Sequence, residues 1–217
     1  MSREPSPPAE VADPERAILV QIDDLQRQLD RITEEAGEKI LRVETANNVQ
    51  KIPLYRKRRE IIAEIPNFWQ IVWLHHGELS TRISEEHEGL LAALQDITVV
   101  NFNDIRNGYC ISMDFADNDF FENASIKRTY HLSTDPPMTE ISDIRWKENK
   151  KPRRARDDGM ETFLEWLAYP TDPGNDVIAE MLKDDVYPNP VQYFSMPDVV
   201  EDGEISDGFL EGQNVVN

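Results

Sequence analysis

Residues 17–43 read AILVQIDDLQRQLDRITEEAGEKILRV, and their apolar positions recur as they would on one face of a helix. Steps of four and three residues separate these positions, which is the heptad pattern of a coiled coil. Two consecutive steps of four, around Ala36, resemble a stutter, which locally unwinds a supercoil. The stripe consists of Ile18, Ile22, Leu25, Leu29, Ile32, Ala36, Ile40 and Val43. We expect this helix to organise the fold.

The flanking sequence sets the expected ends of the helix. Asp13 followed by Pro14 is typical of a helix start, so a helix is predicted over 14–64, with a kink or break near Pro53. The proline-rich residues 1–13 are predicted to form a disordered tail. A helix about 70 Å long cannot bury its apolar stripe alone. Nothing later in the chain matches its length, which favours a homodimer over an intramolecular bundle.

The rest of the chain predicts a compact α+β domain over 65–197, followed by a short acidic tail over 198–217. Alternating apolar residues indicate four strands, and Asn107-Gly108 is typical of a hairpin turn. Short connections favour an antiparallel sheet with packed helices beside it. Strands are expected over 97–102, 109–115, 126–132 and 139–146, and helices near 68–73, 84–94, 160–168 and 176–186.

Composition points to a cationic partner. The 217 residues include 42 Asp and Glu against 23 Lys and Arg, a formal net charge of −19. Such a surface repels nucleic-acid phosphates and attracts basic proteins. The single cysteine, Cys110, excludes an intrachain disulfide framework and any multi-cysteine metal site. No run of 18 apolar residues and no signal peptide is present, so we expect no membrane partner.

The sequence carries no catalytic signature. It has no phosphate-binding glycine loop, no His-Glu-x-x-His motif and no nucleophile elbow. We therefore predict no catalytic residues, no metal site and no cofactor, and a protein that is not an enzyme. His75 and His76 are expected to be polar residues at a helix end, and Cys110 a packing residue on a strand.

A basic run interrupts the acidic second half of the chain. It consists of Lys147, Lys150, Lys151, Arg153, Arg154 and Arg156. Three interpretations remain open: a nuclear import signal, a contact to DNA phosphates, or a loop that neutralises its acidic neighbours. The compact cluster of basic pairs favours nuclear import.

Five short segments in order resemble the nucleosome assembly protein family, most closely its SET, or template-activating factor, branch. They are IPNFW (65–69), FFEN (120–123), IRWK (144–147), FLEWL (163–167) and KDDVYPNPVQYF (183–194). The resemblance implies a headphone-shaped dimer in which each long helix carries an "earmuff" domain. It also implies a non-catalytic chaperone. We expect the protein in the nucleus, and shuttling to the cytoplasm stays open. Such a chaperone binds core histones, both the dimer pair and histones three and four, shields them from non-specific DNA contact, and assists nucleosome assembly and chromatin remodelling.

Carried over by position, the resemblance implies that histones bind near the KDD motif. The implied residues are Thr171, Asp172, Asp176, Glu180, Asp184 and Asp185. A spacing of four places Asp176, Glu180 and Asp184 on one helix face, where their mutual repulsion favours a cationic partner. A solvated acidic face is the alternative. Val177 stands where the branch commonly has an acid, and the tail carries only six acidic residues. Two other functions stay open: inhibition of a serine/threonine phosphatase, and acidic coiled-coil scaffolding.

Overall fold

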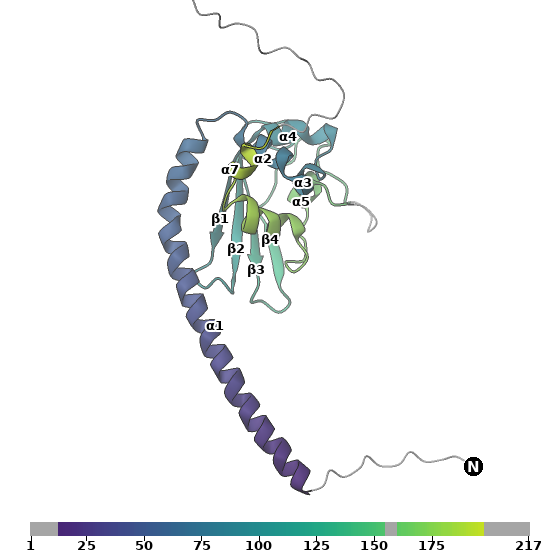
Figure 1. Ribbon diagram of the computed structural model, residues 1–217. Helices are drawn as coiled ribbons and strands as arrows, with labels where there is room; N and C mark the ends of the chain where they lie inside the picture. The colour runs from purple at the N-terminus through teal and green to yellow at the C-terminus, as the bar shows by residue number, and fades with distance from the viewer. Residues whose placement is uncertain (1–12, 155–159, 198–217) are drawn as a thin grey trace, which may run out of the picture.

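The computed structural model describes residues 13–154 and 160–197, which form a long helix and a compact domain beside its C-terminal part (Figure 1). The two predicted tails lie outside the described residues, apart from Asp13, which begins the long helix. The fold class is the predicted one, a long N-terminal helix followed by a four-stranded antiparallel sheet with packed helices.

The long helix, α1 (Asp13–Ile62), continues through Pro53, so the expected break does not occur. A proline inside a helix removes one backbone hydrogen bond and crowds the preceding turn. Contacts with the domain hold the helix at this point, because the Tyr55 ring packs 4.8 Å from the Tyr187 ring. The helix bows gently along its length, as long helices do when they wrap a core (Figure 1).

The sheet has the strand order β1-β2-β3-β4, and all neighbours are antiparallel. Its strands are β1 (Leu94–Asn101), β2 (Gly108–Phe115), β3 (Ser125–His131) and β4 (Met138–Ile141). Gly108 begins β2 at φ 137°, where an added Cβ would lie 1.8 Å from the Tyr130 carbonyl oxygen. The turn before it therefore spans 102–107, and the Asn-Gly pair closes this loop instead of forming a two-residue hairpin.

The fourth strand is shorter than predicted. It ends at Ile141 because the Ser142 hydroxyl, in place of a carbonyl, accepts the Lys127 N–H at 2.9 Å. Residues 143–146 leave the ladder, and Trp146 pairs instead with Phe121 through an isolated bridge. β4 is thus a short edge strand.

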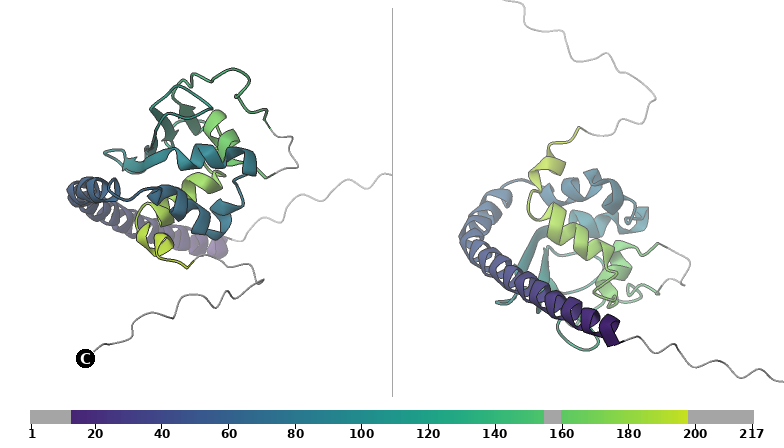
Figure 2. Two further views of the ribbon diagram at one scale, coloured as in Figure 1. Left: turned by 90° about the horizontal axis from the view of Figure 1, so that it is seen from above. Right: turned by 60° about the horizontal axis from the view of Figure 1, so that its bottom comes forward.

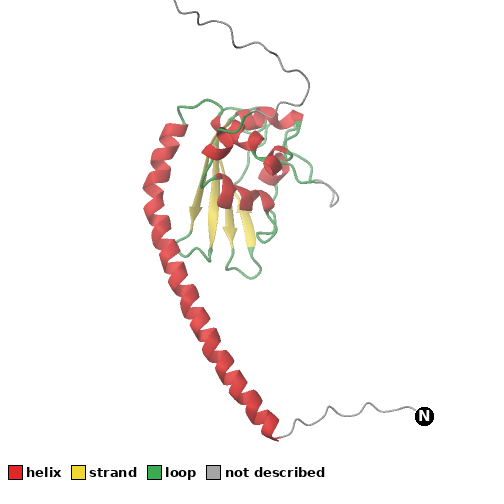
Figure 3. Cartoon of the chain, viewed as in Figure 1, coloured by secondary structure: helices red, strands yellow, loops and turns green. Residues whose placement is uncertain are grey.

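Short helices cover one face of the sheet (Figure 3). They are α2 (Phe68–His75), α3 (Gly77–Ser80), η1 (Glu85–His87), α4 (Glu88–Ala92), α5 (Phe163–Ala168), α6 (Val177–Glu180), the π-helical η2 (Met181–Val186) and α7 (Val191–Phe194). Alternate residues of β2, such as Ile111 and Met113, face these helices and are fully buried, whereas Cys110 is half-buried on the other face. A capping box of Thr162 and Glu165 begins α5.

Two arginines join α1 to the domain. The Arg58 guanidinium lies 4.6 Å from the Tyr55 ring centroid and 4.9 Å from that of Tyr187, and its Nη1 donates to the Pro188 carbonyl at 3.1 Å. Arg59 bridges two strands, because its Nε lies 3.1 Å from Asp96 and its Nη2 contacts Asp114. Burial raises the pKa of Asp96 even though Arg59 lowers it. The C-terminal part of α1 is therefore firmly attached.

Candidate functional site

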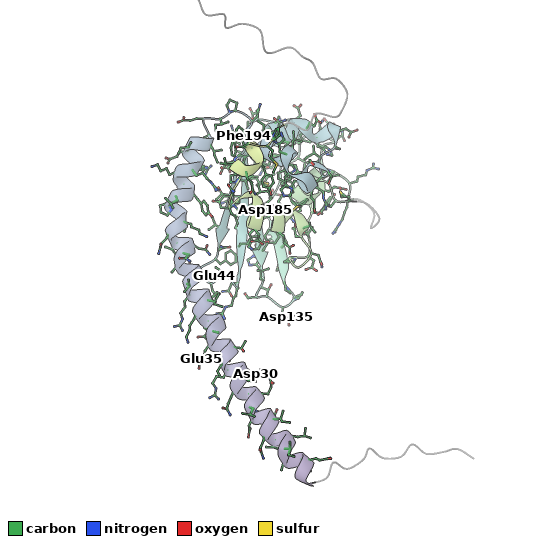
Figure 4. The ribbon with its side chains drawn as sticks, in the orientation of Figure 1. Asp30, Glu35, Glu44, Asp135, Asp185 and Phe194 are labelled. Atoms are coloured by element: carbon green, nitrogen blue, oxygen red, sulfur yellow. The ribbon has the colours of Figure 1, made fainter. Side chains whose placement is uncertain are left out.

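The predicted partner-binding residues lie on α6, η2 and the loop before them, which pass over the helical face of the sheet (Figure 2, right). The Lys183 Nζ lies 5.3 Å from the centroid of the Tyr109 ring on β2, which fixes η2 over the sheet. Figure 4 labels Asp185 on this segment and three further carboxylates, Asp30, Glu35 and Glu44, along α1.

Asp176 is buried, with 1% of the residue exposed, so it cannot contact a partner. Its carboxylate lies 3.0 Å from Arg128 and accepts hydrogen bonds from the Trp166 indole at 2.8 Å and the Tyr130 hydroxyl at 2.8 Å. It also caps α6 by accepting the Ala179 N–H at 2.9 Å. The sequence-based role of Asp176 is therefore wrong, because every interaction of this residue is internal.

Arg128 is the cation at the centre of this buried cluster and is 0% exposed. Its Nη1 donates to the carbonyls of Trp166 and Tyr169, and its Nε donates to the Tyr130 hydroxyl. Its Nη2 donates to Asp176 and, at 2.8 Å, to the Thr171 hydroxyl. All five guanidinium hydrogens thus have acceptors, which is the condition under which a buried charge is tolerated.

Two further predicted residues, Thr171 and Asp185, are half-buried and are tied to the domain by hydrogen bonds. The Thr171 hydroxyl accepts from Arg128 and donates to Asp176, so this residue belongs to the buried cluster. Asp185 accepts hydrogen bonds from the Tyr193 hydroxyl and from Gln192 at 3.0 Å, and it lies 3.4 Å from the His76 Nε2. Asp185 therefore ties η2 to neighbouring helices.

Of the predicted carboxylates only Asp176 is buried, and Asp185 keeps 46% of its side chain exposed although it is bonded to its neighbours. The other three, Asp172, Glu180 and Asp184, are exposed, and we call them the acidic surface. The expected alignment with Asp176 on one helix face is wrong, because Asp176 points inward. Glu180 and Asp184 still act on one shared neighbour, the Tyr109 hydroxyl. Burial raises the pKa of the Tyr109 hydroxyl, and the negative charges of Asp176, Asp184 and Glu180 raise it further.

Within the acidic surface the local contacts differ. Asp172 accepts hydrogen bonds from the Gly174 N–H at 3.1 Å and the Asn175 side chain at 2.7 Å, which fixes the loop before α6. The Lys183 Nζ lies 2.6 Å from Asp184 and offsets part of its charge. Among the described predicted carboxylates, Glu180 and Asp184 make the fewest contacts that stabilise the fold.

The apolar stripe of α1 is uncovered in the single chain. Its seven larger side chains are 55 to 64% exposed, and Ala36 is exposed too. The helix turns another face to the domain, because Leu41, Thr45 and Asn48 are half-buried and Ile62 is buried. The stripe and the domain therefore use separate faces of one helix.

The basic run is exposed from Lys147 to Arg154, and Arg156 lies outside the described residues. The Lys147 Nζ donates to the Asn118 carbonyl at 2.5 Å, and Lys150 lies over the Phe120 ring. Lys151 and Arg154 lie 5.7 and 5.9 Å from the Tyr169 ring centroid. Aromatic rings thus hold part of this segment against the domain.

Within residues 13–154 and 160–197 no group of three or more His, Cys, Asp and Glu side chains could hold a metal ion. No described helix is long and apolar enough to cross a membrane. His76 caps α3, because its Nδ1 accepts the Leu79 N–H at 3.2 Å. The sequence-based interpretation missed the buried role of Arg128, although its alternation with Ile126 and Tyr130 was a usable signal.

Comparison with known proteins identifies sequence relatives of this chain. A family described as "Nucleosome assembly protein (NAP)" matches residues 62–156. Protein SET of Drosophila melanogaster is 38% identical over 203 residues, covering 85% of this chain and 76% of the relative. Protein SETSIP of Homo sapiens is 35% identical over 191 residues, covering 82% of this chain and 65% of the relative.

Solved structures share the fold. A nucleosome assembly protein from a malaria parasite superposes with a TM-score of 0.70 at 22% identity, covering 86% of this chain and 98% of that chain. Ccp1 superposes with a TM-score of 0.65 at 23% identity, covering 80% and 95%. The sequence relatives show that the chain belongs to the nucleosome assembly protein family and, within it, to the SET branch.

Proposed function

We propose that this protein is a histone chaperone that binds core histones through its acidic surface and limits their non-specific contact with DNA. The observation that carries the proposal is the exposure of Glu180 and Asp184 on a domain of the nucleosome assembly protein family. A net charge of −19 adds a long-range attraction for basic proteins.

In the proposed mechanism, the acidic surface and the DNA phosphates compete for the same basic side chains of the histones. Histone lysines and arginines that pair with the acidic surface are withheld from DNA phosphates until a higher-affinity DNA site takes them. Because exposed charge pairs are screened by salt, affinity should fall as ionic strength rises. Each exposed pair is worth about 0.2–1 kcal/mol, so affinity has to come from several pairs together.

We further infer that the protein acts as a homodimer in the nucleus. The uncovered stripe on α1 supports self-association, because seven large apolar side chains on one helix face are costly to leave in water. The exposed basic run supports nuclear import, with DNA contact as the alternative role. Phosphatase inhibition and coiled-coil scaffolding stay predictions without a supporting contact among the described residues.

Titration with labelled core histones, the dimer pair in one series and histones three and four in another, tests the proposal. The variant replaces Asp172, Glu180 and Asp184 with their amides, and the matched control replaces Asp117, Asp119 and Glu148, which are exposed on other loops. Both variants lose three charges. The first should weaken binding about 10-fold, from about 1.4 kcal/mol of lost pairing, and the control less than about 3-fold. Equal weakening by both would show that only total charge matters and would refute the site.

A further inference from the structure

The outer edge of β4 has unpaired backbone groups. β4 ends the sheet on the side away from α1 (Figure 1), and it pairs with β3 in regular register. Because the Ser142 N–H donates to the Lys127 carbonyl at 2.9 Å, alternation turns the backbone of Thr139 and Ile141 away from β3. No described backbone group pairs with these two outward positions. Such an edge is a template for one more strand.

A pocket of about 300 Å³ lies beside this edge. Thr139 and Ile141 line it from the strand, and they share the helical face of the sheet with Tyr130 and Arg128, their partners across the ladder. The rest of the apolar wall comes from Ile144, Trp146, Ala168 and Pro170. A residue of an added strand that lies opposite Ile141 would therefore place its side chain in an apolar space.

One polar group that lines this pocket lacks a partner. Thr139 is only 8% exposed, and its hydroxyl is buried without a hydrogen-bond partner among the described residues. A buried hydroxyl that makes no hydrogen bond is costly. An acceptor on a ligand residue opposite Thr139 would remove this cost, so the hydroxyl points to a polar ligand group at this position.

Cations lie at the rim of the pocket. Lys151 lines it, and the Lys151 and Arg154 cations lie 5.7 and 5.9 Å from the centroid of the Tyr169 ring. The Tyr169 hydroxyl donates to the Pro152 carbonyl at 2.6 Å, which holds the basic segment in place. A ligand carboxylate at the rim would thus meet cations that the domain already positions.

The nearby acids leave this basic character in place. Asp143 lines the pocket but lies beyond the end of β4. Glu140 points to the other face of the sheet, because side chains alternate along a strand, and its carboxylate lies 3.4 Å from His131. The two cations at the rim against the one acid in the lining favour an anionic group on the ligand.

We propose that β4 is a docking edge for an extended, acidic peptide of a partner protein, which adds to the sheet as an antiparallel fifth strand. One aliphatic side chain enters the pocket opposite Ile141. A carboxylate two residues later lies opposite Thr139, where it accepts from the hydroxyl and pairs with Lys151. Backbone hydrogen bonds supply affinity in such strand addition, and side-chain pockets supply selectivity. This inference does not depend on histone binding, and the basic rim disfavours basic histone segments.

Titration of the full chain with the end-blocked peptide Thr-Thr-Ile-Thr-Asp-Thr tests the proposal. At saturation, the peptide should slow hydrogen exchange of the Thr139 and Ile141 amides by about 10-fold or more, because these amides gain acceptors. The Glu140 amide should change less than about 2-fold, because it already bonds to β3. N-methylation of the isoleucine in the peptide should weaken binding by about 10-fold or more, since that amide faces β4. N-methylation of the threonine that follows it should change binding less than about 2-fold, since that amide faces solvent.

Variants of the rim test the charge pairing. Lys151→Gln combined with Arg154→Gln should weaken binding of the peptide about 5-fold. The matched control, Lys39→Gln combined with Lys57→Gln on the exposed surface of α1, should weaken it less than about 2-fold. Replacing the aspartate of the peptide with asparagine should cost about 5-fold in the parent protein. It should cost less than about 2-fold in the rim variant, because the cations that pair with the aspartate are already gone.

Other outcomes overturn the proposal. Unchanged exchange at Thr139 and Ile141 with the peptide bound, or no binding at about 1 mM peptide, would mean that the edge is not its site. Equal binding of the two N-methylated peptides would show that no strand is added, and equal weakening by the two double variants would show that only total charge matters. Protection of the two amides by a DNA duplex but not by the peptide would make nucleic acid the occupant. Protection that grows with protein concentration without the peptide would identify a second copy.

Discussion

Replacing Asp176 with asparagine should destabilise the domain by about 3 kcal/mol. The substitution keeps the size of the side chain and one carbonyl acceptor, so the Ala179 cap can persist. It removes the charge that compensates Arg128, which is 0% exposed. Breaking one side of a buried ion pair costs about 3–5 kcal/mol, and the lower end applies because asparagine still accepts one hydrogen bond.

Urea unfolding followed by tryptophan fluorescence measures the effect, since Trp166 contacts Asp176 directly. With an m-value of about 2 kcal/mol per molar urea, the midpoint should fall by about 1.5 M. Protein concentration has to be equal in all samples, because self-association adds to apparent stability. Glu180→Gln is the control, and its exposed side chain should leave the free energy of unfolding within about 0.5 kcal/mol of the parent.

A double variant sharpens the test. Arg128→Met alone leaves the Asp176 charge buried and unpaired, whereas Arg128→Met combined with Asp176→Asn leaves no charge. The combined loss should therefore be smaller than the sum of the single losses, by about 1–3 kcal/mol. Additive losses, or an Asp176→Asn midpoint equal to that of the parent, would refute the argument that the pair is a unit of the fold.

Three other predictions concern separate parts of the molecule. Burial lowers the pKa of His87 below 6.5, so the unfolded chain binds more protons and stability should fall as pH drops below 6.5; His87→Gln should flatten that fall in urea midpoints measured across about pH 5–7. Leu29→Glu puts a charge in the stripe of each copy and should give a monomer in sedimentation velocity at micromolar concentration, whereas Arg31→Glu on the same helix should not; a dimeric Leu29→Glu protein would contradict the dimer proposal. Gly108→Ala should cost about 2 kcal/mol or more, because the new Cβ meets the Tyr130 carbonyl and φ is 137°; thermal unfolding compared with Gly89→Ala, which has open space, checks this.

The spacing of apolar residues predicted much of this fold, because the helix and the strands repeat their apolar positions at clearly different intervals. The heptad stripe from Ile18 to Val43 predicted α1, and alternation from Tyr109 to Phe115 predicted β2, with the aromatic and apolar positions on the buried face. The predicted helix break was wrong, because tertiary contacts determine whether the helix continues. Pro53 does not end α1, because Tyr55 and the two arginines that follow bind the helix to the domain.

The candidate site was harder to predict, because a carboxylate looks the same in sequence whether it faces a partner or a buried cation. A spacing of four suggested that Asp176 and Glu180 share a face, but Asp176 precedes α6 as its cap and turns toward Arg128. The counter-charge comes from a strand 48 residues earlier, which no local pattern reveals. Arg128 in an otherwise apolar strand face was the one local hint of a buried anion.

The attachment of α1 through Arg58 and Arg59 has a mechanical consequence. Every described side chain from Glu15 to Ile40 is exposed. This part of the helix is about 40 Å long, and only the helix beyond its C-terminal end contacts the domain. A tilt of about 5° at the attached end moves the N-terminal end of the helix by roughly 4 Å over that length. In the proposed dimer, loosening either arginine would therefore leave each domain folded but make the distance between the two domains more variable.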